Sequence, residues 1–192
     1  SKPISFISRI ISYILPVFFI GFVVVYWVTS NSFYLSILSY LFLFNMAFAG
    51  LFFKRIQLEI ATTSAIDKTI HHYSLLLQKI ENEAFESEKL KDLQKKLLFE
   101  KANASQHFKK LAELFSKMDT MANLLTASLF NGTVLYHFHV FHSLIEWKRE
   151  HAKVLESWLS VIGEFELLNS LANFSFNNPD FAYPKLNTHY EI

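Results

Sequence analysis

Histidines are the side chains of this sequence whose type and spacing come closest to a chemical site. His137, His139 and His142 fall within one short segment, and neutral imidazole is a common ligand for zinc and other transition metals. On a helix, however, His137 would point about 200° away from His139, which shares a face with His142. We therefore interpret the three histidines as imidazoles that border a packed face, with a metal site as the alternative. His71 and His72 are adjacent, so their side chains would diverge as well.

The sequence contains no motif for catalysis or for phosphate binding. A phosphate-binding loop needs the pattern Gly-x-x-x-x-Gly-Lys-Ser/Thr, which the four scattered glycines do not supply. A glycine-flanked serine nucleophile and a His-Glu-x-x-His zinc motif are absent too. We therefore predict no catalytic, cofactor-binding or metal-ligating residue in this chain.

Basic residues gather in one part of the chain, where acidic residues are interleaved with them. The cations are Lys89, Lys91, Lys95, Lys96, Lys109 and Lys110, and the anions are Glu86, Glu88, Asp92, Glu100 and Glu113. Mixed charge of this kind is typical of a solvated helix face, whereas a nucleic-acid surface needs an excess of cations. With a formal net charge of +1, the chain itself shows no sign of DNA binding.

A long uncharged segment near the N-terminus is the first structural element that the sequence predicts. From Ile10 through Phe53 there is no Asp, Glu, Lys or Arg. The polar residues 29–32 divide this run into two parts, each close to the roughly 20 residues that a helix needs to cross a bilayer. We therefore predict that residues 1–56 form a transmembrane helical hairpin, which contacts the membrane through residues 10–53.

The charges that flank the hairpin predict its orientation. Lys2 and Arg9 precede the first apolar segment, and Lys54 and Arg55 follow the second. Because cytoplasmic flanks are enriched in basic residues, both ends are expected in the cytoplasm. We predict an inner-membrane protein whose helical domain is cytoplasmic. The alternative is a buried hairpin in a soluble cytoplasmic protein. A signal peptide is disfavoured because a second apolar run follows the first.

From Gln57 onward, charged residues return and apolar residues recur at helical spacing. The pattern predicts a helix that ends near Glu83 and a shorter helix that Ser87 caps and that runs through Leu98. After a turn, one long apolar stripe extends from Phe108 to Leu129, and Asn131-Gly132 kinks or ends that helix. A last helix carries its stripe to Phe176, with Phe165, Leu168 and Ala172 expected to pack on the bundle.

Composition agrees with a helical fold. Hydrophobic residues make up 52% of the chain, and four Gly and four Pro leave little material for the turns of a many-stranded protein. We predict an all-α protein, with the N-terminal apolar hairpin followed by an elongated antiparallel helical bundle over residues 57–176.

The end of the last helix resembles a known family. The segment Glu166-Leu167-Leu168-Asn169-Ser170-Leu171-Ala172, then Asn177-Asn178-Pro179-Asp180 and Tyr183-Pro184-Lys185-Leu186, resembles the end of the helical core domain of the MutS mismatch-repair family. A subgroup, the membrane-associated MutS-like proteins common in Bacteroidetes, is similar over more of the chain. Its landmarks match Ile80 to Ser87, Leu90 to Gln94, Ala104-Ser105, Glu146-Trp147-Lys148 and Trp158. The chain departs from the subgroup at His137, where an acidic residue is usual, and just after Asp119, where an Arg is usual.

The resemblance implies a mechanical function. It implies that residues 57–176 are a MutS-like helical core, a connector or lever, and that residues 177–192 are a linker toward an ATPase domain outside this sequence. The junction residues would be Glu166, Leu168, Ser170, Leu171, Ala172, Asn178, Pro179 and Pro184. ATP and Mg²⁺ would bind that ATPase domain and not this chain, whose partners would be the membrane and its own ATPase domain.

Other expectations stay open at the level of the sequence. The resemblance allows a homodimer, and it allows DNA binding by the parent protein, which would be an ATPase. The alternative function is a membrane-anchored helical scaffold or signalling arm without a nucleotide or DNA partner. A Walker A motif in the continuation of the gene would favour the first function.

Overall fold

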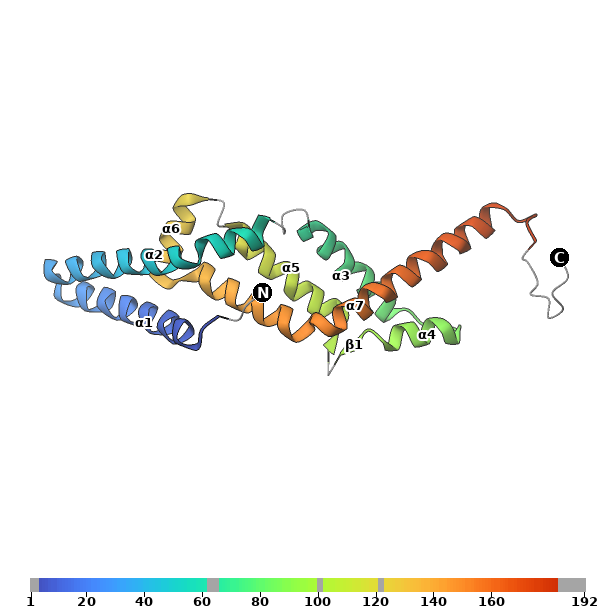
Figure 1. The fold of residues 1–192 in the computed structure, drawn as a ribbon, viewed down its shortest axis with the longest axis horizontal. Coiled ribbons are helices and arrows are strands. Elements are labelled where there is room, and N and C mark those ends of the chain that lie inside the picture. Colours follow the sequence, from blue (N-terminus) through green and yellow to red (C-terminus); the bar gives the residue numbers. More distant parts are fainter. Residues whose placement is uncertain (1–3, 62–65, 100–101, 121–122, 183–192) are drawn as a thin grey trace.

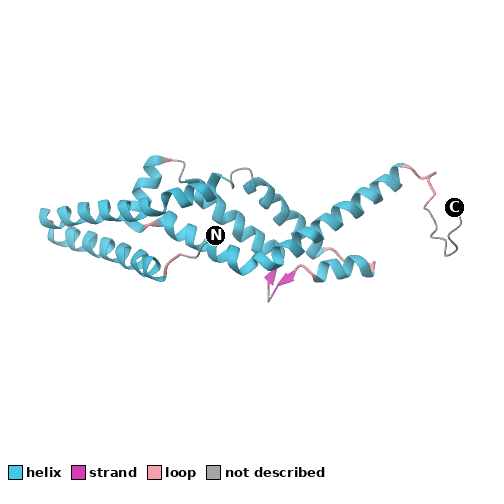
Figure 2. Cartoon of the chain, viewed as in Figure 1, coloured by secondary structure: helices cyan, strands magenta, loops and turns pink. Residues whose placement is uncertain are grey.

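The chain folds into a long and almost wholly helical body (Figure 1). The computed structural model describes residues 4–61, 66–99, 102–120 and 123–182. In chain order the elements are α1 (Phe6–Thr29), α2 (Ser32–Ala61), α3 (Ile66–Asn82), α4 (Glu88–Lys95), β1 (Leu98–Phe99), β2 (Ala102–Asn103), α5 (Ala104–Asp119), α6 (Leu124–Val134) and α7 (Tyr136–Asn177). Figure 2 shows how little of the described chain is strand or loop. The predicted all-α class, with an N-terminal hairpin and an elongated bundle, is confirmed.

The hairpin of α1 and α2 closes through short polar residues. Ser30 ends α1 in the left-handed region with a φ of 51°, and its N–H donates to the carbonyl of Tyr26 at 2.8 Å. The side chain of Asn31 accepts a hydrogen bond of 2.9 Å from the N–H of Phe33 in the first turn of α2. The turn that the polar residues predicted is therefore present. α2 continues without a break past residue 56 and ends at Ala61.

The helical bundle is built from α3, α5 and α7, with α5 antiparallel to both of the others (Figure 1). A line of aromatic rings crosses the three helices. The ring centroids of Tyr73 on α3 and Phe108 on α5 lie 6.3 Å apart, and those of Phe108 and Trp158 on α7 lie 5.9 Å apart. Trp158 is 1% exposed and Phe108 is 2% exposed. Because full burial of a large apolar side chain contributes about 1.5–3 kcal/mol, these rings fix α7 to the other two helices.

Polar side chains hold α4 and the start of α5 at the end of α3. The amide of Gln94 on α4 donates to the carbonyls of Ile80 at 2.7 Å and Glu83 at 2.8 Å, which lie at the C-terminus of α3. The carboxylate of Glu81 accepts a 2.9 Å hydrogen bond from the N–H of Ser105 in the first turn of α5. Both contacts satisfy backbone groups that helix ends leave unpaired.

Two helix boundaries differ from the predicted ones. α4 begins after Ser87 as expected, but the Ser87 side chain makes no capping hydrogen bond, and the helix ends at Lys95 and does not reach Leu98. Leu98 pairs instead with Asn103 in the antiparallel contact of β1 and β2, so the backbone at Leu98 is in a strand and not in the helix. The turn that the sequence predicted lies next to this contact. Lys101 of that turn is outside the described residues.

The long helix predicted from Phe108 to Leu129 is wrong, because the chain forms two helices there. α5 ends at Asp119, and Asn123 begins α6 by accepting hydrogen bonds from the N–H groups of Leu125 at 3.0 Å and Thr126 at 3.2 Å. This N-cap starts a new helix in a new direction. Asn131-Gly132 does not end α6 but lies inside it, buried. Gly132 is needed there because the ring of Phe42 on α2 occupies the space that a Cβ would fill.

The predicted last helix is confirmed as α7, which ends at Asn177. The side chain of Asn178 donates to the carbonyl of Phe174 at 2.8 Å, and Pro179 cannot continue a helix. The packing of its end is only partly as expected. Phe165 packs on Phe85 with ring centroids 5.5 Å apart, and Leu168 also contacts the core.

Beyond Leu168, α7 leaves the bundle. Ala172 is exposed and Phe176 is 84% exposed, so the prediction that these two residues pack on the bundle is wrong. The physical reason is length. α7 extends past the ends of α3 and α4 and projects from the body (Figure 1), so its stripe meets no helix of the described chain there.

Candidate functional site

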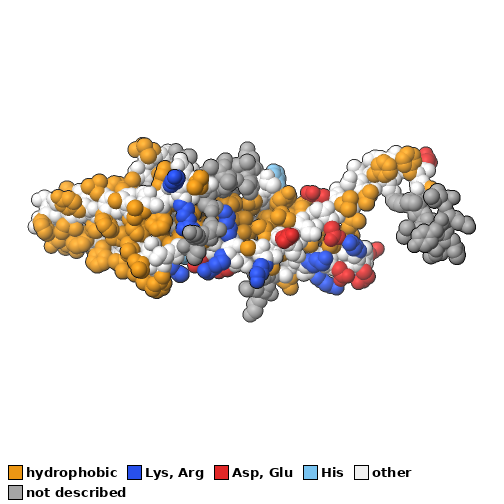
Figure 3. Space-filling view, in the orientation of Figure 1, with side chains coloured by type: hydrophobic (Ala, Val, Ile, Leu, Met, Phe, Trp, Pro, Cys, Tyr) orange, Lys and Arg blue, Asp and Glu red, His pale blue; other side chains and the backbone are white. Residues whose placement is uncertain are grey.

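The hairpin is an exposed apolar surface. α1 and the segment Ser32–Leu58 of α2 are each long and apolar enough to cross a membrane. In the most apolar part of α1 only 6% of residues are buried, and in that of α2 only 22%. Because a core helix of a soluble protein is mostly buried, this exposure favours a membrane location over the buried-hairpin alternative. Figure 3 shows hydrophobic side chains covering this half of the molecule, whereas charged side chains appear in the other half.

Residues of α6 and of the first turn of α7, which are distant in sequence from the hairpin, pack against α2. The rings of Phe48 and Phe52 on α2 lie 5.4 Å and 4.8 Å from that of Phe138 in the first turn of α7. Asn45 on α2, which is fully buried, donates from its side-chain amide to the carbonyl of Gly132 at 2.9 Å. The helices α6 and α7 therefore meet beside the predicted membrane segment, where we had expected only α1 and α2.

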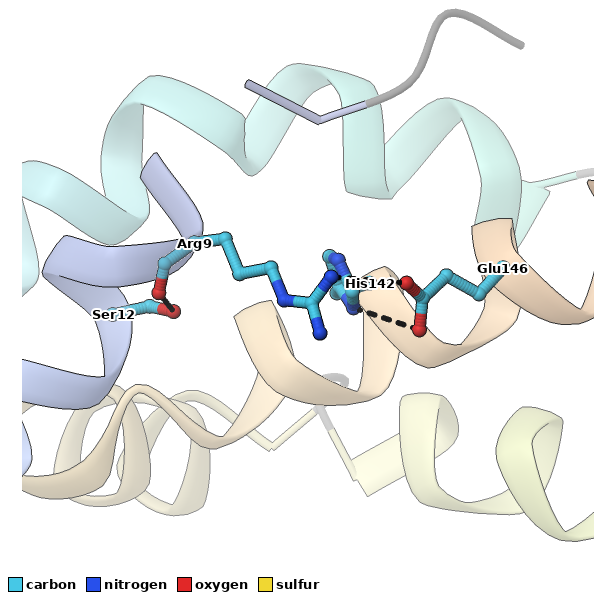
Figure 4. A network of polar contacts seen from close by, with 4 residues as sticks. All are labelled: Arg9, Ser12, His142 and Glu146. Carbon is cyan, nitrogen blue, oxygen red and sulfur yellow. Dashed lines mark hydrogen bonds and ion pairs between the residues drawn. The ribbon is translucent and has the colours of Figure 1, made fainter. Parts of the chain in front are cut away.

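Charged side chains reappear at the bundle end of the apolar hairpin, on α1, α2 and α7. Arg9 on α1 lies with its Nη1 3.4 Å from Oε1 of Glu146 on α7, and Nδ1 of His142 lies 3.4 Å from the other carboxylate oxygen. On α2 the guanidinium of Arg55 lies 5.5 Å from the ring centroid of Phe141, a cation–π contact. Figure 4 shows Arg9 reaching from α1 toward His142 and Glu146. These residues mark where the uncharged half of the molecule ends.

A pocket of about 500 Å³ opens at this level between α1 and α7. Its lining combines apolar side chains such as Phe6 with the cations Arg9, Lys148 and Arg149 and the carboxylate of Glu146. Cations therefore outnumber the carboxylate in the pocket. Such a lining can accept the acidic headgroup of a lipid while apolar side chains face its chains.

The three clustered histidines point to different partners. Nε2 of His137 lies 2.9 Å from the hydroxyl of Thr120 on α5, and Nε2 of His139 lies 3.0 Å from the carbonyl of Ser12 on α1. His142 lies beside Glu146. The predicted divergence of His137 from the other two is confirmed. In the part of the chain that the structure describes, no group of three or more potential ligand side chains is placed to hold a metal ion.

A histidine pair that we did not predict joins α5 to α7. Nδ1 of His151 lies 2.9 Å from the carbonyl of Trp147, so that nitrogen must carry the proton and donate. Nε2 of His151 lies 2.8 Å from Nδ1 of His107, and in neutral imidazoles His107 is then the donor. The rings of Trp147 and Trp158 stack on the pair, with centroids 4.6 Å from His151 and 5.4 Å from His107. The two histidines lie far apart in sequence, and only the helical spacing of both on core-facing positions hinted at their contact.

The predicted junction residues lie on one exposed stretch of the chain. Glu166, Ser170, Leu171, Ala172 and Pro179 are exposed, Leu168 and Asn178 are half-buried, and Pro184 lies outside the described residues. The last ionic contact before this stretch is that of Lys89 on α4 with Glu164, at 2.7 Å. This hydrogen bond holds the pKa of Glu164 below its ordinary value. Among the described residues, the predicted junction residues therefore follow the last ion pair that holds α7 to the bundle.

Comparisons of this chain with protein-family models, with curated proteins and with solved structures give no match. The fold and the exposed hairpin define a helical protein with features of a membrane anchor.

Proposed function

We propose that this chain is a membrane-tethered helical connector that couples a downstream ATP-binding domain of a MutS-like ATPase to the rest of the protein. The observation that carries the proposal is the continuity of α7. It is a helix of 42 residues, which at 1.5 Å per residue is about 63 Å long. It begins against the hairpin at Phe138, passes through the bundle core at Trp158, and ends in the exposed junction.

The packing of α7 suits a lever. Phe138 at its start and Trp158 near its middle are both 1% exposed, so the helix is held at two separated places. Rigid packed helices are the elements through which two sites can influence each other. A movement at the free end of α7 would therefore reach the hairpin through one stiff element.

The exposed end of α7 offers a surface to which a partner domain can bind. Leu167, Leu171, Phe174 and Phe176 are 59%, 55%, 56% and 84% exposed. Apolar side chains gathered in this way mark an interaction surface. In the proposed arrangement, the ATPase domain of the parent protein covers them and binds ATP and Mg²⁺.

The chain departs from the MutS-like pattern at two places that lie together in the structure. His137 stands near the position where the subgroup usually has an acid, and Thr120 stands near the usual Arg. The two side chains face each other at 2.9 Å. The proposal therefore assigns no charge-based function to this contact between α5 and α7.

The charge distribution supports an orientation. Arg9, Lys54 and Arg55 flank the hairpin on the side of the bundle, and its turn carries no charge. By the positive-inside rule the bundle is cytoplasmic and the hairpin spans the inner membrane. For the parent protein the resemblance also allows a homodimer and allows DNA as a partner. The net charge of +1 gives no sign of DNA binding by this chain itself.

The continuation of the gene tests the proposal most directly. We expect a Walker A motif within roughly the next hundred codons, since a P-loop opens such a domain. In the parent protein, hydrogen exchange of residues 164–177 should slow on addition of ATP and Mg²⁺, while that of α3 should not. Two results would favour the alternative of a membrane-anchored scaffold without a nucleotide partner. One is a reading frame that ends without a P-loop, and the other is hydrogen exchange of residues 164–177 that does not change on addition of nucleotide.

A further inference from the structure

A second uncharged segment lies in the middle of the chain. From Thr120 through Ile145 there is no Asp, Glu, Lys or Arg. This segment contains α6 and the first turns of α7. The neighbouring helix α5 carries Lys109, Lys110 and Glu113 on its exposed face, as a helix in water should. The absence of charge is therefore a local property of the α6–α7 turn.

The exposed side chains of α6 include leucines, whereas one of its two buried residues is the polar Asn131. Leu124, Leu125 and Leu129 are 79%, 82% and 57% exposed, whereas Asn131 is only 5% exposed. The hydroxyl of Thr133 donates to the carbonyl of Leu129 at 2.7 Å. A helix on a water-soluble protein is expected to bury its leucines and expose its asparagine, whereas exposed leucines and internally bonded polar groups are expected for a helix surrounded by lipid.

The backbone at the α6–α7 turn is satisfied from within the protein. Asn45 of α2, which is fully buried, donates to the carbonyls of Gly132 at 2.9 Å and Thr133 at 3.3 Å. The N–H of Leu135 donates to the carbonyl of Phe130. The side chain of Asn131 accepts a hydrogen bond from the N–H of His137 at 3.1 Å. In hydrocarbon, helix ends are tolerated only where the protein supplies such partners, because water is absent.

We propose that α6 and the first turns of α7 form a re-entrant hairpin that enters the acyl region of the bilayer beside α2. The inference rests on the membrane anchor of the proposed function. Asn45, which binds the turn, lies nine residues before Lys54 on α2, a rise of about 13 Å. The turn therefore reaches less than half of the roughly 30 Å hydrocarbon layer, and the chain returns to the cytoplasmic side before Glu146.

Acyl chains are the occupant of the exposed α6 face because that face is continuous with the hairpin. Leu124, Ala127 and Ser128 share a pocket with Gly50 and Phe53 of α2, within the segment of α2 that is long and apolar enough to span a membrane. A water-soluble partner protein would have to enter the bilayer to cover leucines at this depth.

Site-directed nitroxides can test this in the full chain, which has no cysteine of its own. Leu125→Cys and Leu129→Cys place labels on the exposed face of α6. Val17→Cys on α1, where Val17 is 70% exposed, reports on the anchor itself, and Ser157→Cys on the exposed part of α7 reports on water. Each labelled protein is reconstituted in liposomes, and its collisions with dissolved oxygen and with a water-soluble nickel chelate are measured by power-saturation electron paramagnetic resonance.

We expect Leu125→Cys and Leu129→Cys to collide with oxygen and to be shielded from the nickel chelate, as Val17→Cys is. Leu129→Cys should lie deeper than Leu125→Cys, by up to about 6 Å for four helical residues. Nickel access equal to that of Ser157→Cys would overturn the inference, and so would shielding from both reagents, which indicates a protein cover. Equal depth at the two α6 positions would also overturn it, because the helix would then lie flat. If Val17→Cys were itself open to nickel, the anchor of the proposed function would fail first.

Discussion

Replacing Gly132 by alanine tests how tightly α6 packs on α2. A Cβ at residue 132 would overlap the ring of Phe42, whereas a Cβ at Gly163 or Gly50 would meet no atom within 4 Å. Overpacking of a filled site costs about 1–3 kcal/mol, while alanine in place of glycine inside a helix stabilises by about 0.5–1 kcal/mol. We therefore expect Gly132→Ala to lower the free energy of unfolding by about 0.5–2 kcal/mol, and Gly163→Ala on α7 to raise it by about 0.5–1 kcal/mol.

The assay is reversible unfolding in mixed micelles, followed by circular dichroism as the fraction of denaturing detergent rises. Gly50→Ala, on α2 itself, is the matched control for any effect of a methyl group in the apolar region. Phe42→Leu should reduce the cost of Gly132→Ala, because the shorter side chain leaves room for the new methyl group. If Gly132→Ala were as stable as Gly163→Ala, or if Phe42→Leu left the cost unchanged, the close approach of α2 and α6 would be refuted.

Three further experiments probe other parts of the molecule. Trp158→Ala should lower the free energy of unfolding by about 3–5 kcal/mol, measured by the same titration, because Trp158 is 1% exposed in the core. Glu164→Gln should destabilise the protein at pH 7 but not at a pH below the lowered pKa of Glu164. The hydrogen bond from Lys89 lowers that pKa from its ordinary 4.5, so its contribution is present above the ordinary value and is lost as the pH falls. Equal effects of Glu164→Gln at both pH values would contradict the ion pair. Arg9→Gln and Arg149→Gln should each reduce the preference for anionic over zwitterionic lipids about fivefold, since a basic residue at the headgroup level contributes about 1 kcal/mol. Native mass spectrometry of retained lipids measures this preference, and Lys153→Gln, farther along α7, should leave it unchanged.

The hairpin and the last helix could be predicted because their signals are local. The uncharged run of residues 10–53 and the polar residues at its centre specify two apolar helices and a turn without reference to any other part of the chain. The end of α7 is similarly local, since Asn178 followed by Pro179 favours the end of a helix. The contact of His107 with His151 is different. It depends on how α5 and α7 are aligned, and spacing along either helix does not determine that alignment.

The path of residues 104–142 could not be predicted from apolar spacing alone. The residues from Phe108 to Leu129 recur as one heptad-like stripe, yet Phe108 is 2% exposed and Leu125 is 82% exposed. A stripe shows which side of a helix is apolar, but not whether that side meets protein or lipid. The residues on the other sides of the helix carry that information. Along α5 they include Lys109 and Lys110, whereas no charged residue accompanies Leu125 or Leu129 in α6.

The distribution of charge thus separates two environments that hydrophobic periodicity treats as one. Where charged residues stand opposite an apolar stripe, water must lie on their side, so the stripe has to find a protein core. Where a helical segment has no charge on any side, as in α6 and in α1 from Ile10 onward, its apolar side chains can remain exposed if the surrounding medium is lipid. The polar residues of such a helix must then turn inward, as Asn131 does toward His137 and as Asn45 does toward the end of α6. In this chain a buried asparagine is therefore a better marker of the membrane-facing region than an exposed leucine, and Asn45→Leu should disrupt the α6–α7 turn while leaving α3 and α5 packed. Loss of the depth difference between nitroxides at residues 125 and 129, with unchanged hydrogen exchange in α5, is the expected result. An unchanged depth difference would show that the turn holds without this side chain.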